Sequence, residues 1–166
     1  MDIFDILGPV MVGPSSSHTA GAVRIGSMAR TLLGAKPVKA AIHLYGSFAD
    51  TGLGHGTDRA LVAGLLGMKP DDLRIPNAFE EAKKEGLSYT IDTIELRDAH
   101  PNTAVIEAWG EGGKHLEMHA SSLGGGRIMV DKLDGIKVSF TGEYNTLVIR
   151  NLDYYSSEAA VTTILS

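Results

Sequence analysis

Cysteine is absent from this sequence of 166 residues. Its absence excludes disulfide bonds, a thiol nucleophile and any metal site built from thiolates of this chain. Aromatic residues are few, at 6%, with one tryptophan. Basic residues are outnumbered by acidic ones, 15 to 20, and the net charge of -5 argues against a surface for nucleic acid or an anionic membrane.

Long apolar runs are also missing. No run approaches the roughly 20 residues that span a bilayer, and Met1-Asp2-Ile3 does not begin a signal peptide. We therefore expect a cytoplasmic protein. Because 43% of the residues are hydrophobic, the chain can bury a sizeable core, and its length fits one domain, or one domain plus a fragment.

Glycine, by contrast, is abundant, and one glycine opens an unusual polar stretch, Gly-Pro-Ser-Ser-Ser-His-Thr at residues 13–19. Apolar spacing after it predicts a helix to about Leu33. A serine hydroxyl can cap that helix, and its free N–H groups and dipole favour an anion. The alternative is an ordinary capped core helix. Gly21 and Gly26 each weaken a helix by up to about 1 kcal/mol, so we expect another backbone to pack closely there.

Periodicity and turn residues predict the other elements. The expected helices are residues 2–7, 59–66 (capped by Thr57 or Asp58), 78–84 and 159–165. The expected strands are 38–45, 87–91 with a bulge or bend before 94–96, 104–109, 116–121, 127–130, 136–140 and 146–150. This pattern predicts an α+β fold with a mixed or mainly antiparallel sheet and helices on one side, without specifying the strand order.

Three separate loops carry a histidine among small hydrogen-bonding residues: His18, His55 and His100. His55 is flanked by glycines, so it has no packing role, and Asp58 lies within local reach. An imidazole beside a carboxylate is how a general base is oriented and tuned. A structural histidine in a turn is the alternative.

Other constellations are less informative. His115, Glu117 and His119 share a strand face, but the outer two lie about 13 Å apart at roughly 3.3 Å per residue, too far for one ion. A solvated strand face is the better interpretation, and the same holds for His43. The glycine clusters at 52–56 and 124–126 match neither a P-loop nor a dinucleotide fingerprint, and no nucleophile elbow is present.

Four motifs together resemble one family. They are Gly-Pro-Ser-Ser-Ser-His-Thr (13–19), Tyr-Gly-Ser-Phe-Ala-x-Thr-Gly-x-Gly-His-Gly-Thr-Asp (45–58), His-Pro-Asn-Thr (100–103) and Ser-x-Gly-Gly-Gly (122–126). In order and over nearly the whole chain, they resemble the β chain of bacterial iron–sulfur-dependent L-serine dehydratases (L-serine deaminases). The resemblance implies a β domain at residues 1–143, similar to the allosteric substrate-binding domain of some phosphoglycerate dehydrogenases. Residues 144–166 would begin an ACT-like domain.

The activity that the resemblance implies is the elimination of water from L-serine, giving an enamine that hydrolyses to pyruvate and ammonia. A [4Fe-4S] cluster would be held by cysteines of a partner α chain, and its iron can act as a Lewis acid on the β-hydroxyl. This chain would bind no cofactor alone and would be inactive without the α chain. We also expect a homodimer of this chain, with no nucleic-acid or membrane partner.

Carried over residue by residue, the resemblance gives His55 as the base or its positioning group and Asp58 as its orienter. His18 is the other candidate catalytic residue, and no metal ligand is expected. The remaining expected contacts to the substrate are Ser15, Ser16, Ser17, Thr19, Gly54, Thr57, His100, Asn102 and Ser122. The three serines would hold the carboxylate of L-serine.

Two further hypotheses belong to other classes of protein. The chain could be a regulatory module that binds a small amino acid or carboxylate without catalysis, or a pure assembly subunit. The histidines discriminate among these, because a sensor needs the serines and glycines but has little need for His55.

Overall fold

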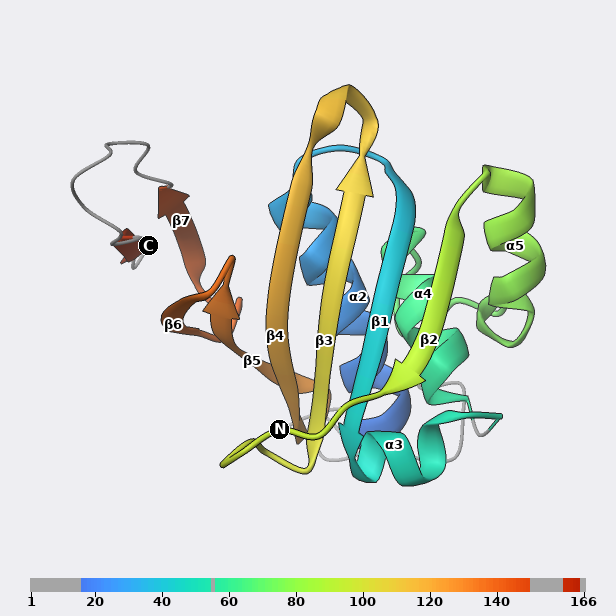
Figure 1. Ribbon diagram of the computed structural model, residues 1–166, viewed down its shortest axis with the longest axis horizontal. Helices are drawn as coiled ribbons and strands as arrows, with labels where there is room; N and C mark the ends of the chain where they lie inside the picture. Colours follow the sequence, from blue (N-terminus) through green and yellow to red (C-terminus); the bar gives the residue numbers. More distant parts are fainter. Residues whose placement is uncertain (1–15, 55, 150–159, 165–166) are drawn as a thin grey trace, which may run out of the picture.

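The computed structural model describes residues 16–54, 56–149 and 160–164 (Figure 1). The helices are η1 (Ser16–Ala20, π-helical), α2 (Gly21–Leu33), α3 (Ser47–Gly52), α4 (Thr57–Leu65), η2 (Ile75–Asn77), α5 (Ala78–Glu85) and η3 (Glu111–Gly113). The strands are β1 (Pro37–Gly46), β2 (Ser88–Thr93), β3 (Asn102–Gly110), β4 (His115–Gly124), β5 (Arg127–Leu133), β6 (Ile136–Phe140), β7 (Asn145–Ile149) and β8 (Ala160–Ile164). In this part of the chain, no helix has both the length and the apolar character needed to cross a membrane.

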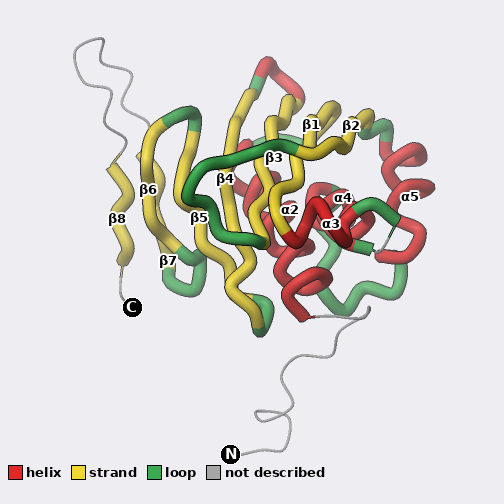
Figure 2. The backbone as a smooth tube through the Cα atoms, turned by 60° about the horizontal axis from the view of Figure 1, so that its bottom comes forward, coloured by secondary structure: helices red, strands yellow, loops and turns green. Residues whose placement is uncertain are grey.

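Six strands form one mixed sheet in the order β2-β1-β3-β4-β5-β6, so the predicted α+β class is confirmed. β1 and β2 are parallel, and their connection contains α3, α4 and α5, as a parallel crossover requires. The other neighbouring pairs in this sheet are antiparallel. β7 and β8 form a separate antiparallel ribbon next to β6 (Figure 2).

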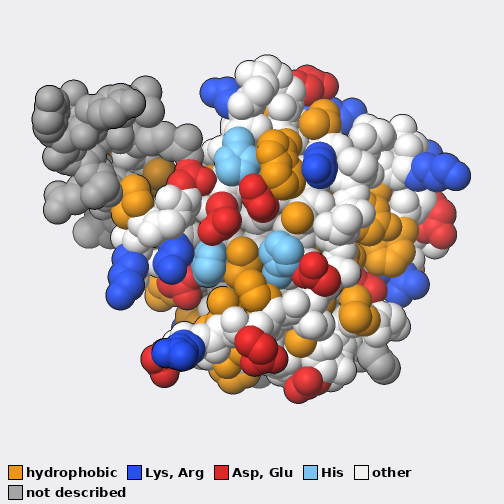
Figure 3. Space-filling view, viewed as in Figure 1, with side chains coloured by type: hydrophobic (Ala, Val, Ile, Leu, Met, Phe, Trp, Pro, Cys, Tyr) orange, Lys and Arg blue, Asp and Glu red, His pale blue; other side chains and the backbone are white. Residues whose placement is uncertain are grey.

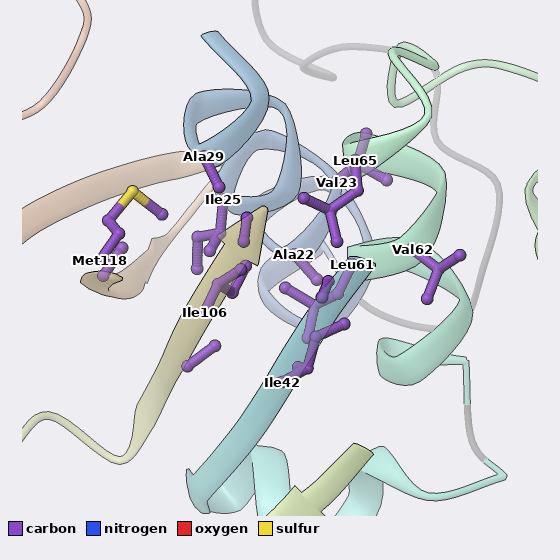
Figure 4. Close-up of a cluster of buried hydrophobic side chains, with 14 of the residues drawn as sticks. Ala22, Val23, Ile25, Ala29, Ile42, Leu61, Val62, Leu65, Ile106 and Met118 are labelled. Atoms are coloured by element: carbon purple, nitrogen blue, oxygen red, sulfur yellow. The ribbon is translucent and has the colours of Figure 1, made fainter. Parts of the chain in front are cut away.

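The helices pack against one face of the sheet, as predicted. In Figure 1, α2 and α4 lie behind β1, β3 and β4. Side chains alternate along β1, so that Ala40, Ile42 and Leu44 are buried under the helices. Figure 4 shows Ile42, Ile106 and Met118 of the sheet in one cluster with helix residues such as Ile25 and Leu61. The opposite face is open in the described part of the chain (Figure 3).

The two long helices cross with their backbones in contact. A Cβ atom at Gly26 would lie 2.2 Å from the carbonyl oxygen of Leu61, and one at Gly64 would lie 2.1 Å from that of Val23. The close backbone approach predicted from Gly26 is therefore confirmed. At Gly21 the closest neighbour is instead a side chain, because a Cβ there would lie 2.0 Å from Ser122 Oγ.

Most predicted strands and helices are confirmed within a few residues, but both predicted helix caps differ. Ala20 occupies the N-cap of α2, without a side-chain capping bond, because the π-helical turn continues directly into the helix. The N-cap of α4 is Gly56, so Thr57 and Asp58 are its first helical residues. β2 ends at Thr93, where the apolar phase flips, and 94–96 is not a strand.

One predicted element is wrong, and one observed helix was not predicted. Residues 160–164 form strand β8, which pairs with β7, where the sequence predicted a helix. This segment contains the β-branched run Val-Thr-Thr-Ile, which favours an extended pleated conformation once a partner strand is present. The short helix α3 was not predicted, since no element was assigned to residues 47–52. The predicted helix at 2–7 lies outside the described residues.

Candidate functional site

The predicted site motifs meet at one end of the main sheet, the lower end in Figure 1. β3 is antiparallel to both β1 and β4, so the carboxyl ends of these two strands lie beside the amino end of β3. Gly46 is paired with Asn102, and Thr103 with Ser121. The loop after β1, the His-Pro-Asn-Thr turn and the end of β4 are therefore adjacent.

His18 is fixed against the turn that follows β1. Its Nε2 lies 3.2 Å from the hydroxyl of Ser47, and its ring centroid is 5.6 Å from that of Phe48. His18 is half-buried, and its neighbour Thr19 is 3% exposed. Ser47 was not among the predicted site residues, although it lies within the 45–58 motif, whose Tyr-Gly-Ser-Phe opening was the signal available.

The His-Pro-Asn-Thr turn packs directly on Gly46. Gly46 has a φ of +61°, and a Cβ there would lie 2.4 Å from the carbonyl oxygen of Pro101, so only glycine fits. Inside the turn, His100 Nδ1 accepts a hydrogen bond from the Asn102 N–H at 3.1 Å. Thr103 Oγ1 donates to the carbonyl oxygen of His100 at 2.6 Å. One ring nitrogen of His100 therefore serves the turn itself.

Asp58 organises the glycine-rich loop before α4. Its side chain is buried, with Oδ2 accepting a bond from the Gly54 N–H at 3.0 Å and Oδ1 from the Arg59 N–H at 2.7 Å. Gly54 and Gly56 have φ values of +83° and +104°, conformations that glycine adopts without strain. Both carboxylate oxygens thus bind backbone N–H groups. Orientation of His55 by this carboxylate remains a prediction, since His55 lies outside the described residues.

Three buried side-chain oxygens in the described part of the chain have no hydrogen-bond partner there: Thr57 Oγ1, Asn102 Oδ1 and Ser122 Oγ. Thr57 is 1% exposed and Ser122 is fully buried. An unsatisfied buried polar group costs about 1–3 kcal/mol, so such groups call for an explanation. All three belong to the substrate-contacting set expected from the motifs.

The predicted set is only partly described by the structure. His18, Thr19, Gly54, Thr57, Asp58, Asn102 and Ser122 lie around this end of the sheet, and His100 is at its edge. His55, Ser15 and the side chains of Ser16 and Ser17 lie outside the described residues.

The other histidines lie on the open face of the sheet, each beside a carboxylate (Figure 3). His43 bonds Asp92, His115 Nε2 lies 2.8 Å from Glu107 Oε1, and His119 Nε2 lies 3.4 Å from Glu117 Oε1. These pairs are separate from the site at the end of the sheet. Within the described ranges, no three His, Asp or Glu side chains are grouped so that they could hold a metal ion.

Comparison with known proteins gives consistent matches. The family model of the serine dehydratase beta chain matches residues 1–133. The probable L-serine dehydratase beta chain of Bacillus subtilis is 42% identical over 164 residues, which cover 99% of this chain and 74% of the relative. The L-serine dehydratase beta chain of Peptoniphilus asaccharolyticus is 43% identical, with coverage of 98% and 72%. The L-serine dehydratase TdcG of Escherichia coli is 31% identical over 80% of this chain, but over only 34% of its own length.

Proposed function

Because the chain belongs to the serine dehydratase beta chain family, we propose that it is the β subunit of an L-serine ammonia-lyase that converts L-serine to pyruvate and ammonia. One structural observation supports this proposal most directly. Among the described residues, the buried oxygens of Thr57, Asn102 and Ser122 have no hydrogen-bond partner, and all three lie on motifs that the sequence singled out for substrate contact. Buried polar groups in folded proteins are usually hydrogen-bonded, so the lack of partners among the described residues supports a ligand at these groups.

The reaction sets clear demands on the protein. A base removes the proton from Cα, the electron pair of the C–H bond forms the C=C bond, and the Cβ–O bond breaks with loss of water. The enamine then tautomerises to an imine, which water hydrolyses to pyruvate and ammonia. The protein must therefore supply a positioned base and polarised donors that hold the carboxylate.

The proposal assigns these tasks to residues of this chain. His55 is the base or positions it, and Asp58 shapes the loop on both sides of position 55 through its bonds to Gly54 and Arg59. His18, held by Ser47, is the second imidazole of the site. The serines at 15–17 would bind the substrate carboxylate, and Asn102 and Ser122 would bind its remaining polar groups.

This chain does not fit a [4Fe-4S] cluster. It has no cysteine, and the described residues contain no group of three other ligands. We therefore assign the cluster to the cysteines of a partner α chain, and the tasks assigned to this chain do not involve it. The E. coli relative supports a requirement for additional sequence, because the match covers only about a third of that protein.

The same proposal extends to the fold. The six-stranded unit would correspond to the allosteric substrate-binding domain of phosphoglycerate dehydrogenases, and residues 144–166 to the beginning of an ACT-like segment. Of that segment, the structure describes β7 and β8, paired as a ribbon.

Anaerobic reconstitution tests the proposed function. The chain is mixed with its cognate α chain, and pyruvate release from L-serine is followed, with each chain alone as a control. We expect activity only in the mixture, and a loss in kcat of about 100-fold or more for His55→Ala, as is typical when a general base is removed. His115→Ala is the matched control, because this histidine lies on the open face of the sheet. The reconstituted enzyme with this variant should release pyruvate at the same rate as the parent.

Two results would contradict the proposal. Full turnover by the α chain alone, merely tuned by this chain, would favour the regulatory module. Undiminished turnover by His55→Ala in the mixture would remove His55 from the mechanism and leave His18 as the imidazole to test.

A further inference from the structure

Ser47 is the first residue of α3, the short helix that Figure 1 shows at the lower end of β1. Its hydroxyl lies 3.2 Å from Nε2 of His18, a residue 29 positions earlier in the chain. Both side chains are half-buried. Among the described residues, this is the hydrogen bond that holds the His18 ring, and it joins η1 to α3.

The backbone at Ser47 is constrained by contacts on both sides in the sequence. Gly46, directly before it, has a φ of +61° and packs on Pro101, because a Cβ there would lie 2.4 Å from the Pro101 carbonyl oxygen. Within α3, Thr51 Oγ1 donates a hydrogen bond of 2.7 Å to the Ser47 carbonyl oxygen. The Ser47 hydroxyl is therefore presented to His18 from a constrained turn.

Phe48 supports the His18 ring next to this hydrogen bond. Phe48 is fully buried, and the two ring centroids lie 5.6 Å apart with the ring planes at 53°. A tilted ring pair at this distance is a favourable arrangement. Two consecutive residues of α3 thus contact one imidazole, one by a hydrogen bond and one by ring packing. The orientation of the His18 ring therefore depends on α3.

The hydroxyl of Ser47 is compatible with more than one protonation state of His18. A serine hydroxyl can donate or accept a hydrogen bond, so Nε2 can accept from Ser47, or carry a proton and donate to it. When Nε2–H donates, Nδ1 can gain a proton and the bond to Ser47 persists in the imidazolium. His18 thus keeps its position while its protonation state changes.

His100 lacks this freedom. Its Nδ1 accepts a hydrogen bond from the Asn102 N–H at 3.1 Å, and a backbone N–H can only donate, so a proton on Nδ1 would break that bond. Of the two imidazoles described at this end of the sheet, His18 is the one that can gain a proton without losing the contact that positions it. Nδ1 is the nitrogen left for this, since it has no hydrogen-bond partner among the described residues.

We infer that Ser47 is a positioning residue, which holds His18 by Nε2 and leaves Nδ1 as the nitrogen that contacts the substrate. The inference rests on the proposed function, in which His18 is the second imidazole of the site. It deepens that function by naming the contacting atom and the residue that orients it. Ser47 itself does not touch the substrate in this assignment, so its loss should act on turnover only through His18.

Kinetics of the reconstituted enzyme with L-serine test the inference. We expect Ser47→Ala to lower kcat about tenfold or more, because a misplaced catalytic group loses the advantage of orientation. Ser47→Thr keeps a hydroxyl at this position and should restore most of the kcat that alanine loses. Ser139→Ala is the matched control. This exposed serine of β6 also bonds a side chain, at Met129 Sδ, and the Ser139→Ala enzyme should turn over as the parent does.

A double-mutant cycle separates positioning of His18 from a general structural role. Ser47→Ala introduced into a His18→Ala enzyme should cause no further loss in kcat, because the ring that Ser47 holds is already gone. An equal loss with and without His18 would show that Ser47 acts on another group.

Nitrogen NMR of the full chain alone, labelled at histidine, tests the contact without turnover. Ser47→Ala should move the ring nitrogen resonances of His18, since Nε2 loses its partner, and should leave those of His115 unchanged. His115 is an internal control, because its ring bonds Glu107 on the open face of the sheet.

Parent-like kcat in Ser47→Ala, a loss that Ser47→Thr does not reduce, or an equal loss in the His18→Ala enzyme overturns the inference and leaves the proposed function intact. A parent mixture that releases no pyruvate overturns the proposed function instead. In that case the NMR resonances decide: a shift confined to His18 supports its positioning by Ser47, and unchanged His18 resonances overturn it.

Discussion

Ser121 and Ser122 are neighbours in β4 that lie in opposite environments. Successive strand residues face opposite sides of a sheet, so Ser121 faces away from the helices and Ser122 faces α2. Ser121 Oγ lies 2.9 Å from Thr103 Oγ1, whereas Ser122 Oγ has no partner among the described residues. The Ser121 hydroxyl is therefore held by a hydrogen bond within the fold, whereas the Ser122 hydroxyl has no such bond among the described residues.

Replacing each serine with alanine should give opposite effects on stability. Ser122→Ala removes an unsatisfied buried hydroxyl and should raise the free energy of unfolding by about 1 kcal/mol, while lowering turnover in the reconstituted enzyme. Ser121→Ala breaks a buried hydrogen bond and should lower the free energy of unfolding by about 1 kcal/mol. Urea denaturation measures both. Equal destabilisation in the two variants would show that Ser122 has a structural partner, and would weaken its assignment to substrate binding.

At this scale the sequence predicted the site through motifs rather than through geometry. Asn102 and Ser122 are far apart in the sequence, and no periodicity indicates that their oxygens are buried without partners. Ser47 was missed although it lies in the 45–58 motif, because its position in that motif does not show that it contacts His18. Its contact with His18 depends on how η1 and α3 pack.

Among the elements, the crossing of α2 and α4 depends on Gly26 and Gly64. Alanine at Gly26 gains up to about 1 kcal/mol of helix propensity but places a Cβ 2.2 Å from the Leu61 carbonyl oxygen, far inside van der Waals contact. The clash must separate the helices. Because overpacking typically costs about 1–3 kcal/mol, we expect Gly26→Ala to lower the free energy of unfolding by about 2 kcal/mol.

The same urea titration measures this loss. Thr31→Ala is the control on an exposed turn of α2 and should change stability by less than about 0.5 kcal/mol. A Gly26→Ala variant as stable as the parent would mean that the helices can separate at no cost, contrary to the close backbone packing.

Long periodic elements were predictable, and short or context-dependent ones were not. The helical spacing of apolar residues in α2 and the alternation of apolar and polar residues in β1 are enough to predict a helix and a strand. α3 has only six residues and ends in glycine, too short for a periodic signal. β8 carries residues that fit a helix or a strand, and its pairing with β7 decides between them. The strand order depends on which strands meet over the helices, which no local pattern contains.

At the scale of the whole molecule, the two sheets differ in how far neighbouring strands and helices stabilise them. β1 and β3 have hydrogen-bonded neighbours on both sides and bury residues such as Ile42 and Ile106 under the helices. β7 and β8 form a ribbon of two strands, an arrangement that is marginally stable by itself. Local stability should therefore fall from the centre of the main sheet to this ribbon.

Hydrogen exchange followed by mass spectrometry measures this gradient. We expect amides of β1 and β3 to exchange only through global unfolding, and those of β7 to exchange at least about 100-fold faster, through local opening. Protection in β7 equal to that in β3 would contradict this expectation and show that the ribbon unfolds only with the main sheet.

The pairing of β1 with β3 has a consequence for how the active form of the chain arises. The elements from η1 to β2 form one half of the described main unit, and β3 to β6, which follow one another through short turns, form the other. The contacts of Gly46 with Pro101 and of Gly21 with Ser122 cross from one half to the other. Neither half contains all the residues of the proposed site, since Thr57 lies in the first half and Asn102 and Ser122 lie in the second. Ligand binding at the proposed site would therefore report whether the two halves have joined.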